Sequence, residues 1–225
     1  MNNSINSSEI DFIQNSEEIN NCSENQLLLK ALEYHKNGQI NQAQHFYSFF
    51  VNKGYQHPTV FTNYGIILTD KSCYEEAISL FEKSLKLFPD VFETHLNLAN
   101  CLRQIGLYSK AKDSAILAIK LNPDSSVAHN SLGLIFLDLN QFNEAESSFR
   151  KALTFNFSFS EAHNNLASVY LSLGKDKEAE AEVKLALKFN KNLAQAYYNL
   201  GLLFKNRDKF DDAATATAHA IKPKP

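Results

Sequence analysis

The sequence predicts an all-α protein, a right-handed α-solenoid (superhelix) of about six tandem helix-turn-helix repeats. First, residues 127–156 and 161–190 resemble each other, with 13 of 30 residues identical at a spacing of 34. Second, the chain from Glu24 onward divides into blocks of 34 residues without an insertion. Third, two positions of every block hold a small residue. One helical hairpin cannot bury its apolar face alone, so a regular repeat of this length predicts a stacked array.

The first 23 residues precede the repeats, and their composition predicts a disordered tail. They contain six Asn, five Ser and four acidic residues but neither Lys nor Arg. Such a segment buries too little apolar surface to fold alone. It also lacks the basic start and the long apolar run of a secretory signal peptide. We therefore expect residues 1–23 to form an acidic tail rich in Asn and Ser.

Each repeat is predicted to be a helix, a tight turn and a second helix. The repeats span 24–57, 58–91, 92–125, 126–159, 160–193 and a shortened 194–225. Position eight of the repeats holds Ala31, Gly65, Ala99, Gly133, Ala167 and Gly201. Position twenty holds Ala43, Ala77, Ala111, Ala145, Ala179 and Ala213. Two antiparallel helices approach closely only where side chains are small, so these positions mark the contact within each hairpin.

The turn and the apolar faces follow the same period. Position fifteen holds residue types that mostly tolerate a turn or left-handed conformation, namely Gly38, Ser72, Gly106, Asn140, Gly174 and Asp208. Large apolar residues occupy position eleven, namely Tyr34, Leu68, Leu102, Phe136, Tyr170 and Phe204. Stacking each hairpin on the next would bury these side chains.

These positions together resemble the tetratricopeptide repeat over residues 24–225. The resemblance rests on the small residues at positions eight and twenty, Leu at seven, aromatic or Leu at eleven, and a frequent Pro at thirty-two, as in Pro89 and Pro123. The sequence departs from the pattern by having no Trp at position four and Lys30 at position seven of repeat one. Three repeats also lack the Pro, with Tyr55, Phe157 and Lys191 in its place. The resemblance implies a helical array that binds other proteins.

Composition and charge exclude several classes of partner. The net charge is −3 and the isoelectric point is about 6.2, whereas a nucleic-acid surface needs a face rich in Lys and Arg. No apolar run approaches the roughly 20 residues that span a bilayer. Cys22, Cys73 and Cys101 form no CxxC pair and indicate neither a disulfide framework nor a zinc site. We expect a cytoplasmic protein that uses no cofactor and binds neither nucleic acid nor membrane.

No catalytic or metal site is expected. The sequence contains no GxGxxG, Walker loop, HExxH or nucleophile elbow. His95, His129 and His163 share position four, but equivalent residues of neighbouring hairpins lie about 8–10 Å apart, whereas zinc ligands lie within about 2 Å of the ion. We expect these histidines to pack at the repeat interface, and we expect the chain not to be an enzyme.

The candidate binding site is an asparagine ladder on the first helices of the repeats. Its members are Asn63, Asn97, Ser131, Asn165 and Asn199 at position six, with Asn130 and Asn164 at position five and Asn100 at position nine. These positions share one face of a helix, on the inner wall of a superhelix. An Asn side chain both donates and accepts, so it can pair with the backbone of an extended peptide of any sequence. The pattern resembles the asparagine ladder of the O-linked N-acetylglucosamine transferase family, which implies a peptide groove.

Two interpretations of the asparagine ladder stay open. The amides bind a peptide or protein, or they solvate the groove and bond to the adjacent repeat. A carboxylate clamp for chaperone C-termini, another binding mode of the family, is not expected. The basic residues that such a clamp requires are missing, and position two holds Glu93 and Glu161 in repeats three and five.

The leading functional hypothesis is a non-catalytic scaffold that binds an extended segment of a partner protein. One alternative is the substrate-targeting arm of a glycosyltransferase- or sulfotransferase-type enzyme whose catalytic domain is absent from this chain. Another is a structural subunit of an assembly. The last helix also offers a surface for self-association, because Ala213, Ala216 and Ala220 lie where earlier repeats receive the next hairpin. We expect this face to be partly exposed or covered by a second copy.

Overall fold

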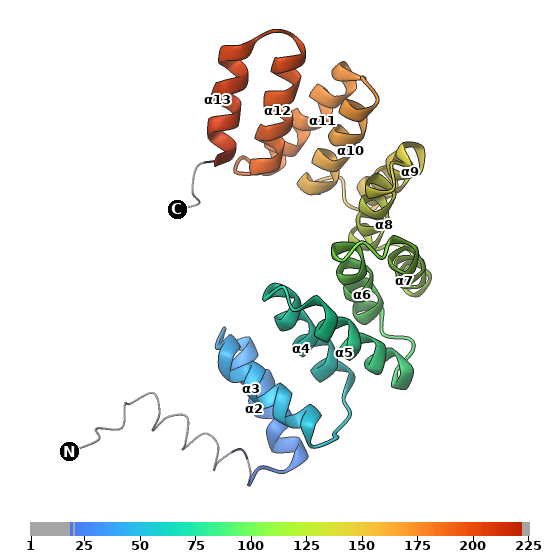
Figure 1. The fold of residues 1–225 in the computed structure, drawn as a ribbon, viewed down its shortest axis with the longest axis vertical. Helices are drawn as coiled ribbons and strands as arrows, with labels where there is room; N and C mark the ends of the chain where they lie inside the picture. Colours follow the sequence, from blue (N-terminus) through green and yellow to red (C-terminus); the bar gives the residue numbers. More distant parts are fainter. Residues whose placement is uncertain (1–18, 20, 222–225) are drawn as a thin grey trace, which may run out of the picture. The chain divides into compact units, whose positions relative to one another are not determined.

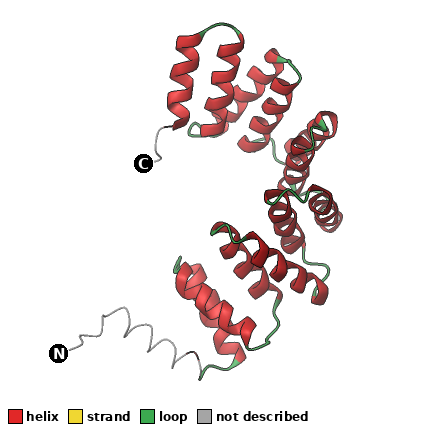
Figure 2. Cartoon of the chain, in the orientation of Figure 1, coloured by secondary structure: helices red, strands yellow, loops and turns green. Residues whose placement is uncertain are grey.

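The computed structural model describes residues 19 and 21–221, and in them the chain consists of helices and turns without a strand (Figures 1 and 2). The twelve helices of this part are α2 (Glu24–Lys36), α3 (Ile40–Asn52), α4 (Pro58–Asp70), α5 (Tyr74–Leu87), α6 (Phe92–Gln104), α7 (Tyr108–Leu121), α8 (Ser126–Asp138), α9 (Phe142–Phe155), α10 (Ser160–Ser172), α11 (Asp176–Phe189), α12 (Ala194–Asn206) and α13 (Phe210–Ile221). The predicted fold class, an all-α solenoid of helix-turn-helix repeats, is confirmed.

Consecutive helices pack as hairpins. The pairs α2 with α3, α4 with α5, α8 with α9, α10 with α11 and α12 with α13 are in contact along their lengths. The second helix of a hairpin also packs on the first helix of the next, as α9 does on α10 and α11 does on α12. In addition, α10 contacts both α8 and α12, so these three first helices lie side by side. Side chains on that face of α8, α10 and α12 can therefore meet across repeats.

The turn inside each hairpin has the backbone conformation that position fifteen predicts. All six residues at this position have a positive φ, between 57° and 77°, and they are Gly38, Ser72, Gly106, Asn140, Gly174 and Asp208. A left-handed residue lets the chain reverse directly after a helix. Ser72, Asn140 and Asp208 adopt this conformation despite carrying a Cβ, which shows that the hairpin geometry decides it.

The chain divides into two compact units, Met1–Cys101 and Leu102–Pro225. In the first unit the core gathers aromatic rings of α3, namely Phe46, Tyr47 and Phe50, around Leu27 and Ala31 of α2. In the second unit the core joins α9 to α12 through Phe149, Leu166, Tyr170, Val183 and Leu203. Each core runs through more than one hairpin, as expected for repeats that cannot fold singly.

In repeats two to five, the small residue at position eight is matched in size to the residue at position twenty-four, on the second helix. A Cβ on Gly65 would lie 2.3 Å from the ring of Phe81, and one on Gly133 would lie 2.6 Å from the ring of Phe149. Repeats three and five instead combine an Ala at position eight with a smaller buried residue, in the pairs Ala99–Ala115 and Ala167–Val183. In repeats two and four a Cβ at position eight would collide with the ring where it stands, so glycine makes room for it. Repeat one is packed differently, because it combines Ala31 with the buried ring of Tyr47 at the same two positions.

Most of the predicted tail, residues 1–18 and 20, lies outside the described residues. Of the rest, Ile19 is buried and belongs to the core of the first unit, with Cys22 packed against that core. Ser23 caps α2: its hydroxyl accepts from the backbone of Gln26, whose side chain accepts in turn from the backbone of Ser23. Such a capping box fixes where the first helix begins.

Candidate functional site

Five members of the asparagine ladder lie in the second unit, and three of them line one pocket. This pocket has a volume of about 460 Å³ and is formed by α8, α10, the turn before α12 and the first turn of α12. Its lining residues are Asn130, Leu134, Glu161, Asn164, Asn165, Asn190, Asn192, Leu193, Ala194 and Gln195. Six of the ten are amide side chains, so the pocket offers both hydrogen-bond donors and acceptors.

Asn130 and Asn165 connect α8 to α10 at this pocket. The Nδ2 of Asn165 donates to the Oδ1 of Asn130 over 3.0 Å. This bond uses one of the two amide hydrogens of Asn165 and one lone pair of Asn130. Among the described residues, no group pairs with the Nδ2 of Asn130 or the Oδ1 of Asn165. The pair thus holds an amide donor and an amide acceptor side by side at the pocket wall.

Asn164 and Asn199 make the equivalent connection between α10 and α12. The Nδ2 of Asn199 donates to the Oδ1 of Asn164 over 2.9 Å and to the hydroxyl of Ser168 over 2.9 Å, with a longer contact of 3.3 Å to the backbone oxygen of Asn164. Asn199 is buried and does not line the pocket, whereas Asn164 does. Asn199 therefore joins two repeats, and Asn164 keeps its own Nδ2 at the pocket.

The other ladder residues have different surroundings. In the first unit the Nδ2 of Asn63 donates to the phenol of Tyr47 over 3.0 Å. Asn97 and Asn100 are partly exposed, and no described side chain bonds to their amides. In the second unit Ser131 is buried and is not part of the pocket. The two Asn–Asn bonds occur where position five of one repeat and position six of the next are both Asn.

Glu161 is the one charged side chain among the described residues that line the pocket, and the sequence considered alone did not single it out as a site residue. Its side chain is exposed, and its Oε2 accepts from the hydroxyl of Ser160 over 2.7 Å. The ion pairs of the described residues do not include it. Asn190, Asn192 and Gln195 were also missed, because they belong to the turn and first residues of the next repeat. Helix periodicity within one repeat gives no signal for them.

The three position-four histidines have a structural role. Each ring donates from Nε2 to the backbone oxygen six residues earlier, over 2.8–2.9 Å, in the pairs His95–Pro89, His129–Pro123 and His163–Phe157. All three side chains are buried. The histidines thus hold the turn between repeats, and the described residues contain no group of three or more His, Cys, Asp or Glu arranged to hold a metal ion.

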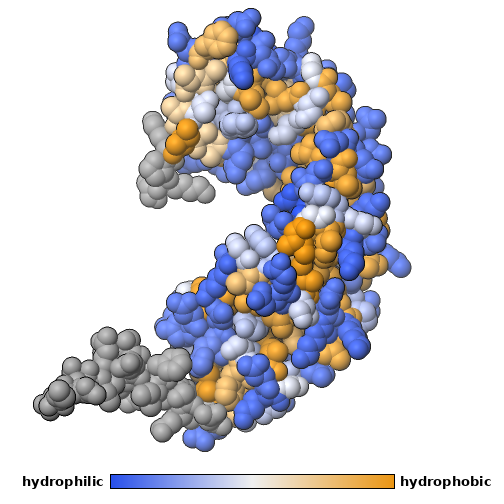
Figure 3. All heavy atoms as spheres, viewed as in Figure 1, coloured by the Kyte–Doolittle hydropathy of each residue, from blue (hydrophilic) through white to orange (hydrophobic). Residues whose placement is uncertain are grey.

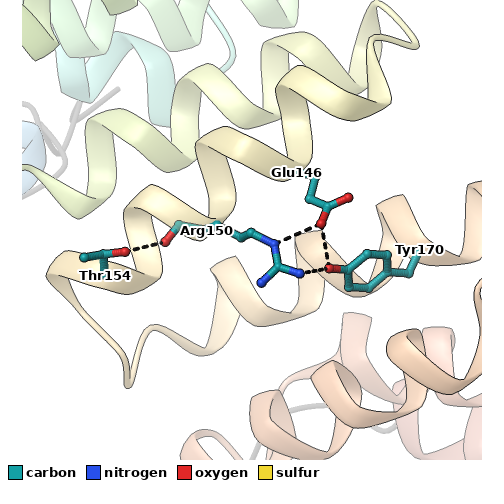
Figure 4. A network of polar contacts seen from close by, with 4 residues as sticks. All are labelled: Glu146, Arg150, Thr154 and Tyr170. Atoms are coloured by element: carbon teal, nitrogen blue, oxygen red, sulfur yellow. Dashed lines mark hydrogen bonds and ion pairs between the residues drawn. The ribbon is translucent and has the colours of Figure 1, made fainter.

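A second polar cluster joins α9 to α10 (Figure 4). Arg150 donates from Nε to Glu146 over 2.9 Å and from Nη2 to the phenol of Tyr170, which itself donates to Glu146 over 2.9 Å. Burial, together with the hydrogen bond to Glu146, raises the pKa of Tyr170 to about 12. Burial opposes ionisation of Glu146, but the hydrogen bonds from Arg150 and Tyr170 and the positive charges of Arg150 and Lys175 outweigh it and lower the pKa of Glu146. This cluster stabilises the contact between repeats four and five.

The last hairpin leaves one face without a following hairpin among the described residues. Figure 3 shows hydrophobic and weakly hydrophobic residues, in orange and pale orange, gathered over α13 at the top of the view. Ala213 and Ala220 are partly exposed, as expected for this face, whereas Ala216 is buried because it lies in a groove beside α12 side chains.

Within the described part of the chain, no helix has the length and apolar character needed to cross a bilayer.

Similarity to known proteins identifies the family. No curated protein matches the sequence. MamA, a solved structure, is 25% identical with a TM-score of 0.59, over 70% of this chain and 92% of MamA. PilF of Pseudomonas aeruginosa is 17% identical with a TM-score of 0.71, over 86% of this chain and 88% of PilF. YrrB, described as a TPR protein with an unusual peptide-binding site, is 19% identical with a TM-score of 0.56, over 78% of this chain and 90% of YrrB.

Two family models, both of the tetratricopeptide repeat, match the sequence itself. They cover residues 70–135 and 130–193, which together are more than half of the chain. The matched segments contain the helices and turns that carry the 34-residue period. The chain belongs to the tetratricopeptide repeat family.

Proposed function

We propose that this chain is a non-catalytic protein-interaction scaffold that binds an extended peptide segment at the pocket between α8, α10 and α12. The observation that carries the proposal is the Asn130–Asn165 pair, which presents an amide donor and an amide acceptor without partners from the described chain. An extended peptide offers a carbonyl and an N–H group in alternation, so it can pair with both. YrrB, a protein of the same fold, is described as having a peptide-binding site, which also supports the proposal.

The ladder residues are proposed to divide into two roles. Asn130, Asn164 and Asn165 line the pocket and would contact the peptide backbone. Asn199 would act indirectly, because both of its amide hydrogens hold α12 against α10. The ladder residues outside the pocket remain predicted contacts of the peptide, namely Asn63, Asn97, Asn100 and Ser131.

Peptide display tests the proposal directly, because it offers many linear sequences to the pocket at once. A library of random linear twelve-residue peptides would be selected on the wild-type protein, and the selected peptides would then be measured by fluorescence anisotropy. Replacing Asn130 and Asn165 together by Ala removes two hydrogen bonds worth about 0.5–1.5 kcal/mol each. We therefore expect the double variant to bind about fivefold to a hundredfold more weakly.

Asn143→Ala is the matched control, because it removes an exposed Asn amide of α9 that belongs neither to the asparagine ladder nor to the pocket. It should leave the affinity unchanged, and circular dichroism should show that all variants keep their helical content. A library that yields no binding peptide would contradict the proposal. So would selected peptides that bind the double variant as tightly as the wild type.

Self-association through the last hairpin is a second proposal, supported by its own observation. A shallow pocket of about 210 Å³ lies on the open face of this hairpin, lined in part by Tyr197, Leu200, Phe204, Ala216 and His219. Phe210 at the start of α13 is 64% exposed. Light scattering at increasing protein concentration should show growth in mass, and Phe210→Ser should reduce it. A protein that stays monomeric at all concentrations would contradict this proposal.

A further inference from the structure

We infer that the pocket at the asparagine ladder selects peptide segments with a cationic side chain, Lys or Arg, which pairs with Glu161. This inference rests on the proposed peptide-binding function and names the chemistry of the segment that is bound. Backbone pairing alone accepts any sequence. The charge in the pocket wall supplies the preference that the amides lack.

The charge balance of the pocket is the first support. Nine of its ten lining residues are neutral, and the tenth is Glu161. Asp138, the acidic residue at the end of α8, is already paired with Arg103, whose Nη1 lies 2.8 Å from the Oδ2 of Asp138. Glu161 has no such basic partner among the described residues. A ligand group at the pocket therefore meets one uncompensated negative charge.

The placement of the acceptors is the second support. Glu161 and Asn165 are four residues apart on α10, so their side chains lie on the same face of that helix. The Oδ1 of Asn165 has no partner in the described chain, because Asn165 bonds to Asn130 through its Nδ2. A carboxylate and an amide oxygen thus stand side by side. An ammonium or a guanidinium carries several donors and no acceptor, which fits such a pair.

Ser160 fixes the carboxylate without neutralising it. Its hydroxyl donates to the Oε2 of Glu161 over 2.7 Å, and Ser160 itself is buried at the start of α10. A side chain that is already ordered loses less conformational entropy when a ligand binds. Glu161→Gln keeps an oxygen acceptor for Ser160 and removes only the charge, so it is a clean test of the inference.

The test uses the peptides selected from the random twelve-residue library, synthesised with acetylated and amidated ends so that no terminal charge contributes. We expect Lys and Arg to be enriched at one register of the selected set. Replacing that residue by Gln should weaken binding to the wild-type protein about threefold to tenfold. Glu161→Gln should weaken binding of the Lys or Arg peptide by a similar factor and leave the Gln peptide unchanged. A second variant, Glu161→Lys, should reverse the preference toward a Glu peptide.

Glu178→Gln is the matched control, because Glu178 is an exposed acid in the first turn of the next helix, α11, and does not line the pocket. It should leave the Lys-to-Gln difference intact. A parallel set with a free N-terminus distinguishes a terminal ammonium from a side-chain cation. Peptides that depend on Asn130 and Asn165 but show no basic preference, or keep it in Glu161→Gln, would overturn this inference alone. Failure to obtain any binding peptide would overturn the proposed function as well.

Discussion

The Nδ2 of Asn199 lies 2.9 Å from the Oδ1 of Asn164, so an amide of the last repeat is bound to the repeat before it. Together with the bond to Ser168, this contact occupies both amide hydrogens of a buried side chain. Asn165 forms the corresponding bond to Asn130 one repeat earlier. In the second unit, the asparagine ladder therefore connects neighbouring repeats and also reaches the pocket.

The first prediction concerns the stability that Asn199 supplies. Asn199→Ala leaves the buried Oδ1 of Asn164 and the half-buried hydroxyl of Ser168 without this donor, so we expect the free energy of unfolding to fall by about 1–3 kcal/mol. Asn97→Ala changes the same repeat position where the amide has no described partner, and it should change stability by less than about 0.5 kcal/mol. Urea unfolding followed by circular dichroism measures both. Equal effects of the two substitutions would contradict the assigned role.

The second prediction concerns the size match between Gly133 and Phe149. A Cβ at Gly133 would lie 2.6–3.0 Å from three atoms of the Phe149 ring, which is fully buried. Gly133→Ala should therefore destabilise the protein by about 1–3 kcal/mol, even though Ala favours helix more than Gly does.

Combining Gly133→Ala with Phe149→Val recreates the Ala167–Val183 pair of repeat five. The double variant should be less destabilised than the two single changes added together, by about 1–2 kcal/mol. Thermal and urea unfolding of the wild type, the two single variants and the double variant give the double-mutant cycle. Simple additivity would show that the ring and the glycine are not coupled.

The third prediction is a stabilising substitution at Ser84. Its hydroxyl is buried, and no described group bonds to it. Repeats three, four and five hold a buried Ala at the equivalent position, namely Ala118, Ala152 and Ala186. Ser84→Ala should raise the free energy of unfolding by about 1 kcal/mol, because it removes a desolvated hydroxyl without a partner. Ser148→Ala serves as the contrast, since that hydroxyl donates to the backbone of Glu144 over 2.8 Å and should give no gain.

The fourth prediction is a loss of stability at alkaline pH through Tyr170. Burial and the bond to Glu146 raise its pKa to about 12, above the value near 10 of an unfolded chain. Between these values the folded protein keeps a proton that the unfolded chain releases, so stability falls as pH rises through this window. From pH 9 to 11 the wild type should lose about 1 kcal/mol more than Tyr170→Phe, as measured by urea unfolding. Parallel pH profiles of the two proteins would contradict this.

Much of the fold could be predicted from the sequence, because the features that fix it are local and repeated. A turn residue at position fifteen sets the backbone of every hairpin, and the observed φ of Ser72, Asn140 and Asp208 follows from that position. Small residues at position eight likewise mark helix contacts. Such features depend on the residue and its place in the period, not on distant parts of the chain.

The candidate site was less predictable, because it depends on pairs of residues from different repeats. Asn165 and Asn199 bond to the preceding repeat only because Asn130 and Asn164 stand 35 residues before them. At the same repeat position Asn63 bonds instead to Tyr47, a residue of its neighbour's second helix. The 35-residue spacing is visible in the sequence and could have indicated these bonds. The position of Glu161 in the pocket follows only from the packing of three helices.

The matching of glycine to a large ring has a consequence for how this gene can recombine. A crossover inside a hairpin would join the first helix of repeat three or five, with Ala99 or Ala167, to a second helix that carries Phe81 or Phe149. A Cβ at Gly65 or Gly133 would lie 2.3–3.0 Å from that ring, so the two joined helices would have to shift. A crossover between hairpins keeps each matched pair on one segment of DNA. Whole hairpins are therefore the units that unequal exchange can add to or remove from this array without separating a glycine from the ring packed against it.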